Sequence, residues 1–192
     1  SKASDLNINP NDHVNFGQSS NDVIPTAIHV SAVTAVSRDL LPAIDELISA
    51  ISLKSDALQG VCKTGRTHLM DAMPVRMDQI LEGWAAQLEN ARALISSTLA
   101  HLQYVALGGT AVGTGINTHR DFSAASTQIL STNMGLEFFP AKEHFSLIGS
   151  QDSAVALSGQ LKTLAVALLK ISNDLRWMNS GPLAGLGEIS LE

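Results

Sequence analysis

The stretch Leu-Lys-Thr-Leu-Ala-Val-Ala-Leu-Leu-Lys-Ile, residues 161–171, is apolar almost all the way round when it is placed on a helix. A helix without a polar face belongs inside a helical bundle. The helix that contains this stretch is expected to span about residues 150–178. Its apolar surface is larger than two other long helices can cover, so further parts of the protein or other subunits are expected to cover the rest.

Two other long segments show apolar residues at helical spacing, about residues 21–59 and 75–105. Pro42 falls inside the first segment and is expected to kink it or to split it in two. A shorter helix is expected over residues 121–134. The sequence therefore predicts an all-α fold, a long-helix bundle in one partial domain over residues 1–192, entered through a polar, turn-rich loop over residues 1–20.

Composition excludes several classes of partner. The formal net charge of -6 argues against a nucleic-acid partner, for which a basic face is expected. No uninterrupted apolar run reaches the roughly 18 residues needed to span a bilayer, so no membrane partner is expected. Cys62 is the only cysteine, which excludes an intrachain disulfide, and its thiol is expected to be inert and at least half-buried.

The segment from Gly65 to Pro74 carries more chemistry than the helices on either side of it. Arg66 brings a fixed positive charge, Thr67 a hydroxyl and His68 an imidazole. Pro74 suits the first turn of the following helix. A cation, a hydroxyl and an imidazole before a helix can hold an anion and move a proton, although a solvated interhelical loop explains the same residues.

Two further polar segments can also be interpreted either as part of a ligand site or as ordinary local structure. Gly17–Asp22 combines two serines, an amide and the free N–H groups of a helix start, which suit a carboxylate or phosphate, while Asn21 or Asp22 as an N-cap is the simpler explanation. Gly108–Gly115 lacks the spacing of a dinucleotide or phosphate loop, so a tight turn packed against a helix is favoured over a place for Thr110 or Thr114 near a site. No histidine stands at a metal-ligand spacing, and no metal is predicted.

Four motifs occur in order along the chain: Gly17-Gln18-Ser19-Ser20-Asn21-Asp22-Val23-Ile24-Pro25-Thr26, Gly65-Arg66-Thr67-His68, Gly109-Thr110-Ala111-Val112-Gly113-Thr114-Gly115 and Asn173-Asp174-Leu175-Arg176-Trp177. Together they resemble the class II fumarases of the fumarase/aspartase superfamily. His68 resembles fumarases rather than aspartases, which tend to carry Gln at that place. The resemblance covers essentially the whole chain.

The resemblance implies a mostly α-helical homotetramer with a central bundle, in which three subunits build each active site. It implies reversible hydration of fumarate, a small dicarboxylate, to L-malate without a metal or other cofactor. His68 would be the proton donor and acceptor. The residues that would bind substrate are Ser19, Ser20, Asn21 and Thr67. A second anion-binding segment of the family resembles Asn9, Pro10, Asn11 and Asp12, but the family begins it with His.

The family's first domain and its C-terminal signature loop, which carries a serine base and a substrate-binding lysine, have no counterpart in these 192 residues. The chain is therefore expected to be a fragment that is inactive alone. Two alternatives stay open: an aspartate ammonia-lyase-like enzyme and a non-catalytic helical scaffold of the same superfamily. A cytoplasmic location is expected, or the mitochondrial matrix if the source is eukaryotic.

Overall fold

The computed structural model describes residues 7–191, in which the chain forms two compact units. Unit 1 contains Ser1–Ser37 and Thr98–Ala156, and unit 2 contains Arg38–Ser97 and Leu157–Glu192. The first six residues of the expected entry loop, and Glu192, lie outside the described part. The expectation of one partial domain over residues 1–192 stays a prediction.

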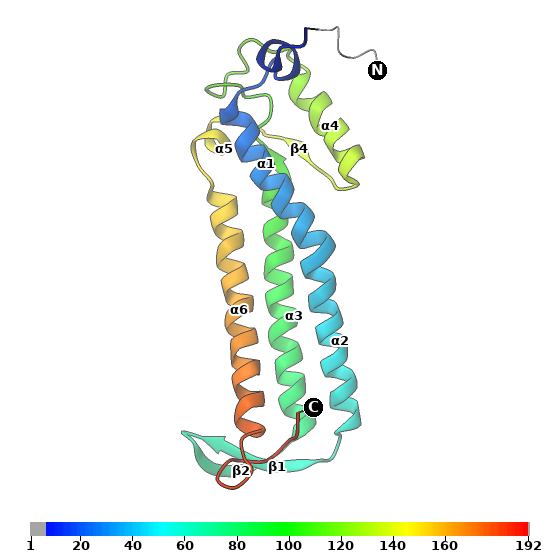
Figure 1. The fold of residues 1–192 in the computed structure, drawn as a ribbon, viewed down its shortest axis with the longest axis vertical. Coiled ribbons are helices and arrows are strands. Elements are labelled where there is room, and N and C mark those ends of the chain that lie inside the picture. Colours follow the sequence, from blue (N-terminus) through cyan, green and yellow to red (C-terminus); the bar gives the residue numbers. More distant parts are fainter. Residues whose placement is uncertain (1–6, 192) are drawn as a thin grey trace. The chain divides into compact units, whose positions relative to one another are not determined.

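Unit 2 is built on three long helices that run alongside one another (Figure 1): α2 (Leu41–Ala57), α3 (Met77–Leu102) and α6 (Asp152–Met178). Only the first five residues of α6 and the last five of α3 belong to unit 1. Arg92 of α3 donates two hydrogen bonds to the carboxylate of Asp45 on α2. The large buried side chains between the helices of unit 2 include Ile44, Ile51, Leu81, Trp84, Leu88, Ile95, Leu164 and Ile171. The helices predicted over about residues 75–105 and 150–178 are therefore present as α3 and α6, with ends that differ by a few residues, whereas α2 covers only the second half of the predicted 21–59 segment.

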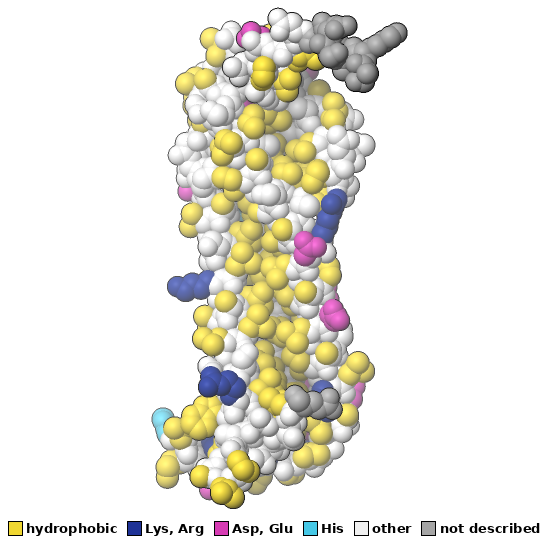
Figure 2. Space-filling model, in the orientation of Figure 1, with side chains coloured by type: hydrophobic (Ala, Val, Ile, Leu, Met, Phe, Trp, Pro, Cys, Tyr) yellow, Lys and Arg dark blue, Asp and Glu magenta, His cyan; other side chains and the backbone are white. Residues whose placement is uncertain are grey.

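Helix α6 keeps much of its apolar surface exposed in this chain. Val166 is 59% exposed and Leu169 is 61% exposed. Figure 2 shows hydrophobic side chains gathered along the helices of unit 2, with few charged side chains among them. By length and composition alone α6 could also cross a membrane, although Lys162 and Lys170 interrupt its apolar run and a core helix of a soluble protein passes the same test. The described chain does not by itself bury the segment that predicted a bundle.

The segment between α2 and α3 is a β-hairpin, which differs from the interhelical loop that was one of its two interpretations. Strand β1 (Cys62–Thr67) pairs antiparallel with β2 (Met70–Arg76). Pro74 pairs with Thr64 inside β2, and α3 begins three residues later, so the assignment of Pro74 to a helix start is wrong. Proline is tolerated because each strand of a two-stranded ribbon is an edge strand. Cys62 is exposed rather than half-buried, because it opens this ribbon.

Unit 1 joins shorter elements around α1: a π-helical turn η1 (Pro10–Val14), α1 (Ser20–Ala35), β3 (Tyr104–Val105), α4 (Phe122–Met134), β4 (Phe139–Pro140) and α5 (Phe145–Gly149). Strands β3 and β4 form a small parallel pair. His29, buried on α1, lies with Nδ1 2.7 Å from the carbonyl oxygen of Tyr104. This contact fixes α1 against β3.

The first long helical segment is divided, as the position of Pro42 predicts. Helix α1 ends at Ala35, a π-helical segment η2 (Val36–Leu40) follows, and α2 begins at Leu41. Pro42 therefore sits in the first turn of α2, where its missing N–H needs no partner. The boundary between the two units falls within η2.

Candidate functional site

The turn that opens α1 is a capping box. Ser19 is the N-cap, and its Oγ accepts a hydrogen bond from the backbone N–H of Asn21 at 3.2 Å. The N–H of Ser19 donates in return to Oδ1 of Asp22 at 2.9 Å. The expectation that Asn21 or Asp22 is the N-cap is wrong, because Asp22 is the third helical residue of the capping box and its side chain reaches back to the N-cap, Ser19. Ser20 and Asn21 are exposed on the turn, beside the N–H groups of the helix start.

Asp22 also holds the glycine-rich turn against α1. Its side chain has no exposed surface, and its Oδ2 accepts hydrogen bonds from the backbone N–H groups of Gly108 and Thr110 at 3.0 and 2.9 Å. Asn21 adds a third link through its Nδ2, which donates to the carbonyl oxygen of Ala111 at 2.8 Å. A buried carboxylate that receives several N–H groups is well satisfied, so this junction is a rigid support for the turn at Ser19.

The glycine-rich segment is a tight turn packed against a helix, as its composition predicts. A Cβ on Gly108 would lie 2.5 Å from Cβ of Ser123 on α4. Thr110 has a left-handed φ of 58°, and its Oγ1 is buried without a hydrogen-bond partner within residues 7–191. A β-branched residue in that conformation is strained. The lesser interpretation, a place for Thr110 or Thr114 near a site, stays a prediction.

The proposed second anion segment forms the start of η1. Oδ1 of Asn9 accepts from the N–H groups of Asn11 and Asp12 at 2.8 and 3.1 Å, and the N–H of Asn9 donates to Nδ1 of His13 at 2.9 Å. Pro10 lies in the same turn, and the whole segment is exposed. The Asn9 side chain therefore occupies the N–H groups that an anion would need at this helix start.

Thr67 and His68 lie at the tip of the β1–β2 hairpin. Thr67 pairs with Met70, which leaves His68 and Leu69 as a two-residue turn with φ values of 52° and 62°. Two positive φ values define the type I′ turn, which normally takes Asn or Gly. His68 and Leu69 hold this conformation at an energetic cost, and residues held in this way are concentrated at functional sites. Both Thr67 and His68 are exposed, so the imidazole is open to a ligand.

The hairpin contains an irregularity at Gly65. Thr64 pairs with Pro74 and Arg66 pairs with Asp71, so Gly65 stands opposite two residues of β2. A Cβ on Gly65 would lie 2.4 Å from the carbonyl oxygen of Met73, a distance that no side chain tolerates. Only glycine allows the strands to approach this closely, one residue before Arg66 and three before His68.

Behind the hairpin, a carboxylate joins β1 to the segment after α6. Oε1 of Glu188 accepts a hydrogen bond from Nη1 of Arg66 at 2.7 Å, and Oε2 lies 3.1 Å from Nζ of Lys63. These residues border a hollow of about 540 Å³ in unit 2 that is also lined by Leu69 and Trp177. Sequence reasoning did not find Glu188, because 122 residues separate it from Arg66 and no local pattern marks it.

The predicted site residues thus fall into groups on different units. Ser19, Ser20 and Asn21 share one turn of unit 1, and Asn9–Asp12 share another. Thr67 and His68 share the hairpin turn of unit 2. The structure brings the members of each group together, and the convergence of the groups stays a prediction.

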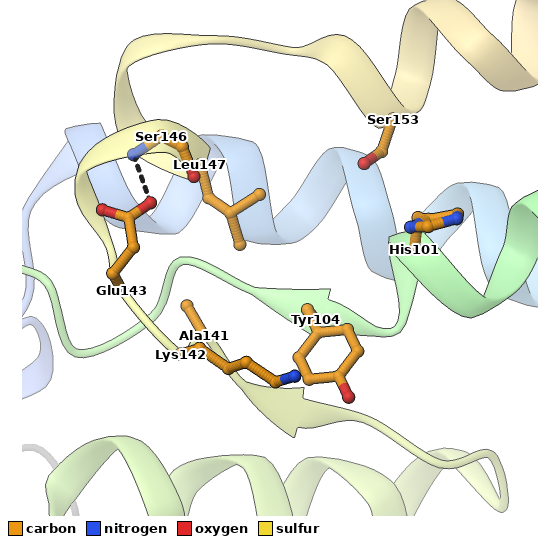
Figure 3. Close-up of a pocket in the computed structure, with 8 residues that line it drawn as sticks. All are labelled: His101, Tyr104, Ala141, Lys142, Glu143, Ser146, Leu147 and Ser153. Carbon is orange, nitrogen blue, oxygen red and sulfur yellow. Dashed lines mark hydrogen bonds between the residues drawn. The ribbon is translucent and has the colours of Figure 1, made fainter.

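A separate hollow of about 270 Å³ in unit 1 contains none of these residues. It lies between Tyr104, Lys142 and Glu143, with His101 at its edge (Figure 3). Hydrogen bonds from Ser146 and the N–H of Phe145 lower the pKa of Glu143, whose carboxylate caps α5. The described residues contain no group of three His, Cys, Asp or Glu side chains arranged to hold a metal ion.

Comparison with known proteins connects the chain to one family. The model of a family described as lyase matches residues 2–192. The chain is 61% identical over 185 residues to fumarate hydratase class II 2 of Pseudomonas aeruginosa. The aligned region covers 96% of this chain and 40% of that relative. It is 55% identical over 184 residues to fumarate hydratase class II of Xylella fastidiosa, and this aligned region covers 96% of this chain and 39% of that relative.

Solved structures have the same fold. The class II fumarase of Schistosoma mansoni superposes with a TM-score of 0.89 at 38% identity, over 96% of this chain and 42% of that one. A fumarate lyase:delta crystallin from Brucella melitensis, bound to cobalt, superposes with a TM-score of 0.92 at 38% identity, over 96% and 40%. This chain spans about 40% of the length of the curated relatives that it matches.

Proposed function

The chain belongs to the lyase family, and from this we propose that the full-length protein is a class II fumarate hydratase, a hydro-lyase that interconverts fumarate and L-malate. The observation that carries the proposal is the 61% identity to a fumarate hydratase over nearly the whole chain. His68 in an exposed, strained turn supports it, because an acid–base group must reach the substrate.

The reaction sets the roles of the residues. Elimination of water from malate needs a base for the C3 proton and an acid for the leaving hydroxyl. In this proposal His68 donates a proton to the leaving hydroxyl, or accepts one from water in the reverse direction, and no metal takes part. Loss of the C3 proton beside a carboxylate builds a doubly charged intermediate. Ser19, Ser20, Asn21 and the N–H groups that open α1 would bind and stabilise this charge, with Thr67 as a further donor.

The proposal includes a homotetramer in which several subunits share each active site. The exposed apolar face of α6 supports it, because surfaces of this kind are normally buried by a partner. The hairpin tip supports it too, since Leu69 is 79% exposed and Met73 is 78% exposed. We further propose a cytoplasmic enzyme of the tricarboxylic acid cycle, or a mitochondrial one in a eukaryote, with no nucleic-acid or membrane partner.

The test is turnover by the full-length protein with malate and, separately, with aspartate. Formation of fumarate from malate, followed by ultraviolet absorbance, is the expected result. Turnover of aspartate alone would instead identify an amino-acid lyase of the superfamily. Turnover of neither substrate by a correctly assembled protein would favour a non-catalytic scaffold.

The isolated 192-residue chain is proposed to be inactive, because the resemblance assigns the carbon base and a substrate-binding lysine to segments that it does not contain. A coupled assay compares this chain with the full-length protein at equal molar concentration. Turnover by the isolated chain within about tenfold of the intact enzyme, a difference of only about 1.4 kcal/mol in barrier, would contradict the proposed division of roles.

A further inference from the structure

We infer that Glu188 is a positioning residue for His68, acting through Lys63 and Arg66 of strand β1. This inference rests on the proposed function, which makes His68 the acid–base group. It adds to that function a residue far from the motifs that define the candidate site.

The first step is the anchoring of Glu188 itself. Its backbone N–H donates to the carbonyl oxygen of Met178 at 2.7 Å, and the N–H of Ile189 donates to the same oxygen at 3.2 Å. The N–H of Gly187 donates to the carbonyl oxygen of Ser180 at 2.8 Å. Residue 188 is thereby attached to the C-terminal end of α6, the last long helix of unit 2 (Figure 1).

The second step is the pairing with β1. The Glu188 side chain is only 12% exposed, and those of Lys63 and Arg66 are 13% and 24% exposed. Ion pairs in such partly buried positions are screened less than surface pairs. Oε2 accepts no hydrogen bond from residues 7–191, so its link to Lys63 is a charge pair, whereas Oε1 has both charge and a hydrogen bond from Arg66. Removing the carboxylate would leave two poorly solvated cations side by side.

The third step explains why both cations can reach one carboxylate. Residues 63 and 66 are three apart, and in a regular strand their side chains would point to opposite faces. The irregularity at Gly65 lies between them, and Gly65 permits it because it has no Cβ to strike the Met73 carbonyl. The same glycine therefore shapes the strand and allows its two cations to converge on Glu188.

The final step leads to His68. Arg66 is two residues before His68, and only Thr67 lies between them. The turn at His68 and Leu69 is strained, and a strained turn persists only where its surroundings hold it. Glu188 supplies that restraint by fixing the end of β1 to the end of α6. Catalysis tolerates little displacement, since an error of about 1 Å in a catalytic group can cost roughly 100-fold in rate.

The experiment uses the full-length protein with Glu188→Gln, the shorter acid Glu188→Asp, and Asp45→Asn as the matched control. Asp45→Asn also breaks an ion pair of unit 2, that with Arg92, but this pair joins α2 to α3 and includes no residue of the hairpin. For Glu188→Gln we expect kcat for malate to fall about 10- to 100-fold with KM changed less than about threefold. Glu188→Asp should recover part of kcat, and Asp45→Asn should keep all of it.

Amide hydrogen exchange, read by mass spectrometry, provides a second measurement that does not depend on the substrate. Glu188→Gln should speed exchange over residues 63–70 and leave α2 unchanged. If Glu188→Gln kept the kcat and the amide exchange rates of the wild type, the inference would be overturned. So would a loss of kcat with faster exchange throughout unit 2, which is a general structural defect. If the wild type turned over no malate, the proposed function would fail, while the exchange pattern would still decide whether Glu188 holds the hairpin.

Discussion

Oδ2 of Asp22 lies 3.0 Å from the backbone nitrogen of Gly108, a residue 86 positions further along the chain. The same carboxylate receives the N–H of Ser19 through its other oxygen. One buried side chain thus supports both the turn that carries Ser19, Ser20 and Asn21 and the glycine-rich turn beside it. The serine–asparagine turn is held in place by a residue that itself faces no solvent.

Replacing Asp22 with Ala should destabilise unit 1 and impair the turn. Three N–H groups would lose their acceptor, and each buried group left without a partner costs about 1–3 kcal/mol. We expect a lower thermal midpoint by calorimetry and a lower kcat/KM for malate in the full-length protein. Asp56→Ala is the control, because Asp56 is exposed and pairs only weakly with Gln59. Equal thermal midpoints for the two variants would show that the Asp22 junction contributes nothing.

Replacing His68 with Asn should abolish most malate turnover while the hairpin stays intact. Asn accepts the left-handed conformation that residue 68 adopts, with φ at 52°, so the turn should be kept. Loss of the acid–base group should lower kcat roughly 100- to 10,000-fold. The measurement is the initial rate of fumarate formation, with His119→Asn, an exposed histidine of unit 1, as control. Unchanged turnover in His68→Asn would remove this histidine from the mechanism.

Gly65→Ala should loosen the hairpin. The added Cβ would lie 2.4 Å from the Met73 carbonyl oxygen, so the strands must separate, at a cost of about 1–3 kcal/mol. Gly83→Ala is the matched control, because Gly83 lies in α3 and a Cβ there meets nothing within 4 Å. Alanine should instead stabilise that helix by about 0.5–1 kcal/mol. Thermal midpoints should move in opposite directions, and a shift of the same sign would contradict the close approach at Gly65.

The ion pair between Asp78 and Arg76 should contribute stability only above a definite pH. The pKa of Asp78 lies below its ordinary value of 3.8, and the largest cause is the hydrogen bonding from the Arg76 side chain. A carboxyl whose folded-state pKa is lowered stabilises the fold above its unfolded-state pKa, and that contribution is lost as the pH falls through the lower folded-state value. Thermal midpoints of the wild type and Asp78→Asn should therefore differ by a constant amount near neutral pH and converge below pH 3.8. A difference that persisted unchanged in strong acid would assign the effect to packing.

The long helices could be predicted because their signal is local. Helix α6 was expected at about residues 150–178 and occupies Asp152–Met178. The division near Pro42 followed from the chemistry of one residue. The N-cap was misplaced by two or three residues, because a capping box depends on two side chains acting together rather than on the residue with the highest preference.

The hairpin could not be predicted in the same way. Residues 62–76 do not alternate apolar and polar side chains, and the turn contains His68 and Leu69 in place of the usual Asn and Gly. Contacts made far along the chain hold it, including that of Arg66 with Glu188. The exposed thiol of Cys62 was missed for the same reason, since burial of a strand depends on what packs against it.

By itself, the sequence determined the helical class and the order of the polar motifs, because apolar periodicity and helix breakers act over a few neighbouring residues. Only the tertiary structure decided which side chains support those motifs. Asp22 meets Gly108, and Lys63 and Arg66 meet Glu188, because the path of the chain brings distant segments together. The free energy of such contacts depends on burial and on distances between residues far apart in sequence, and neither is recorded in the local pattern.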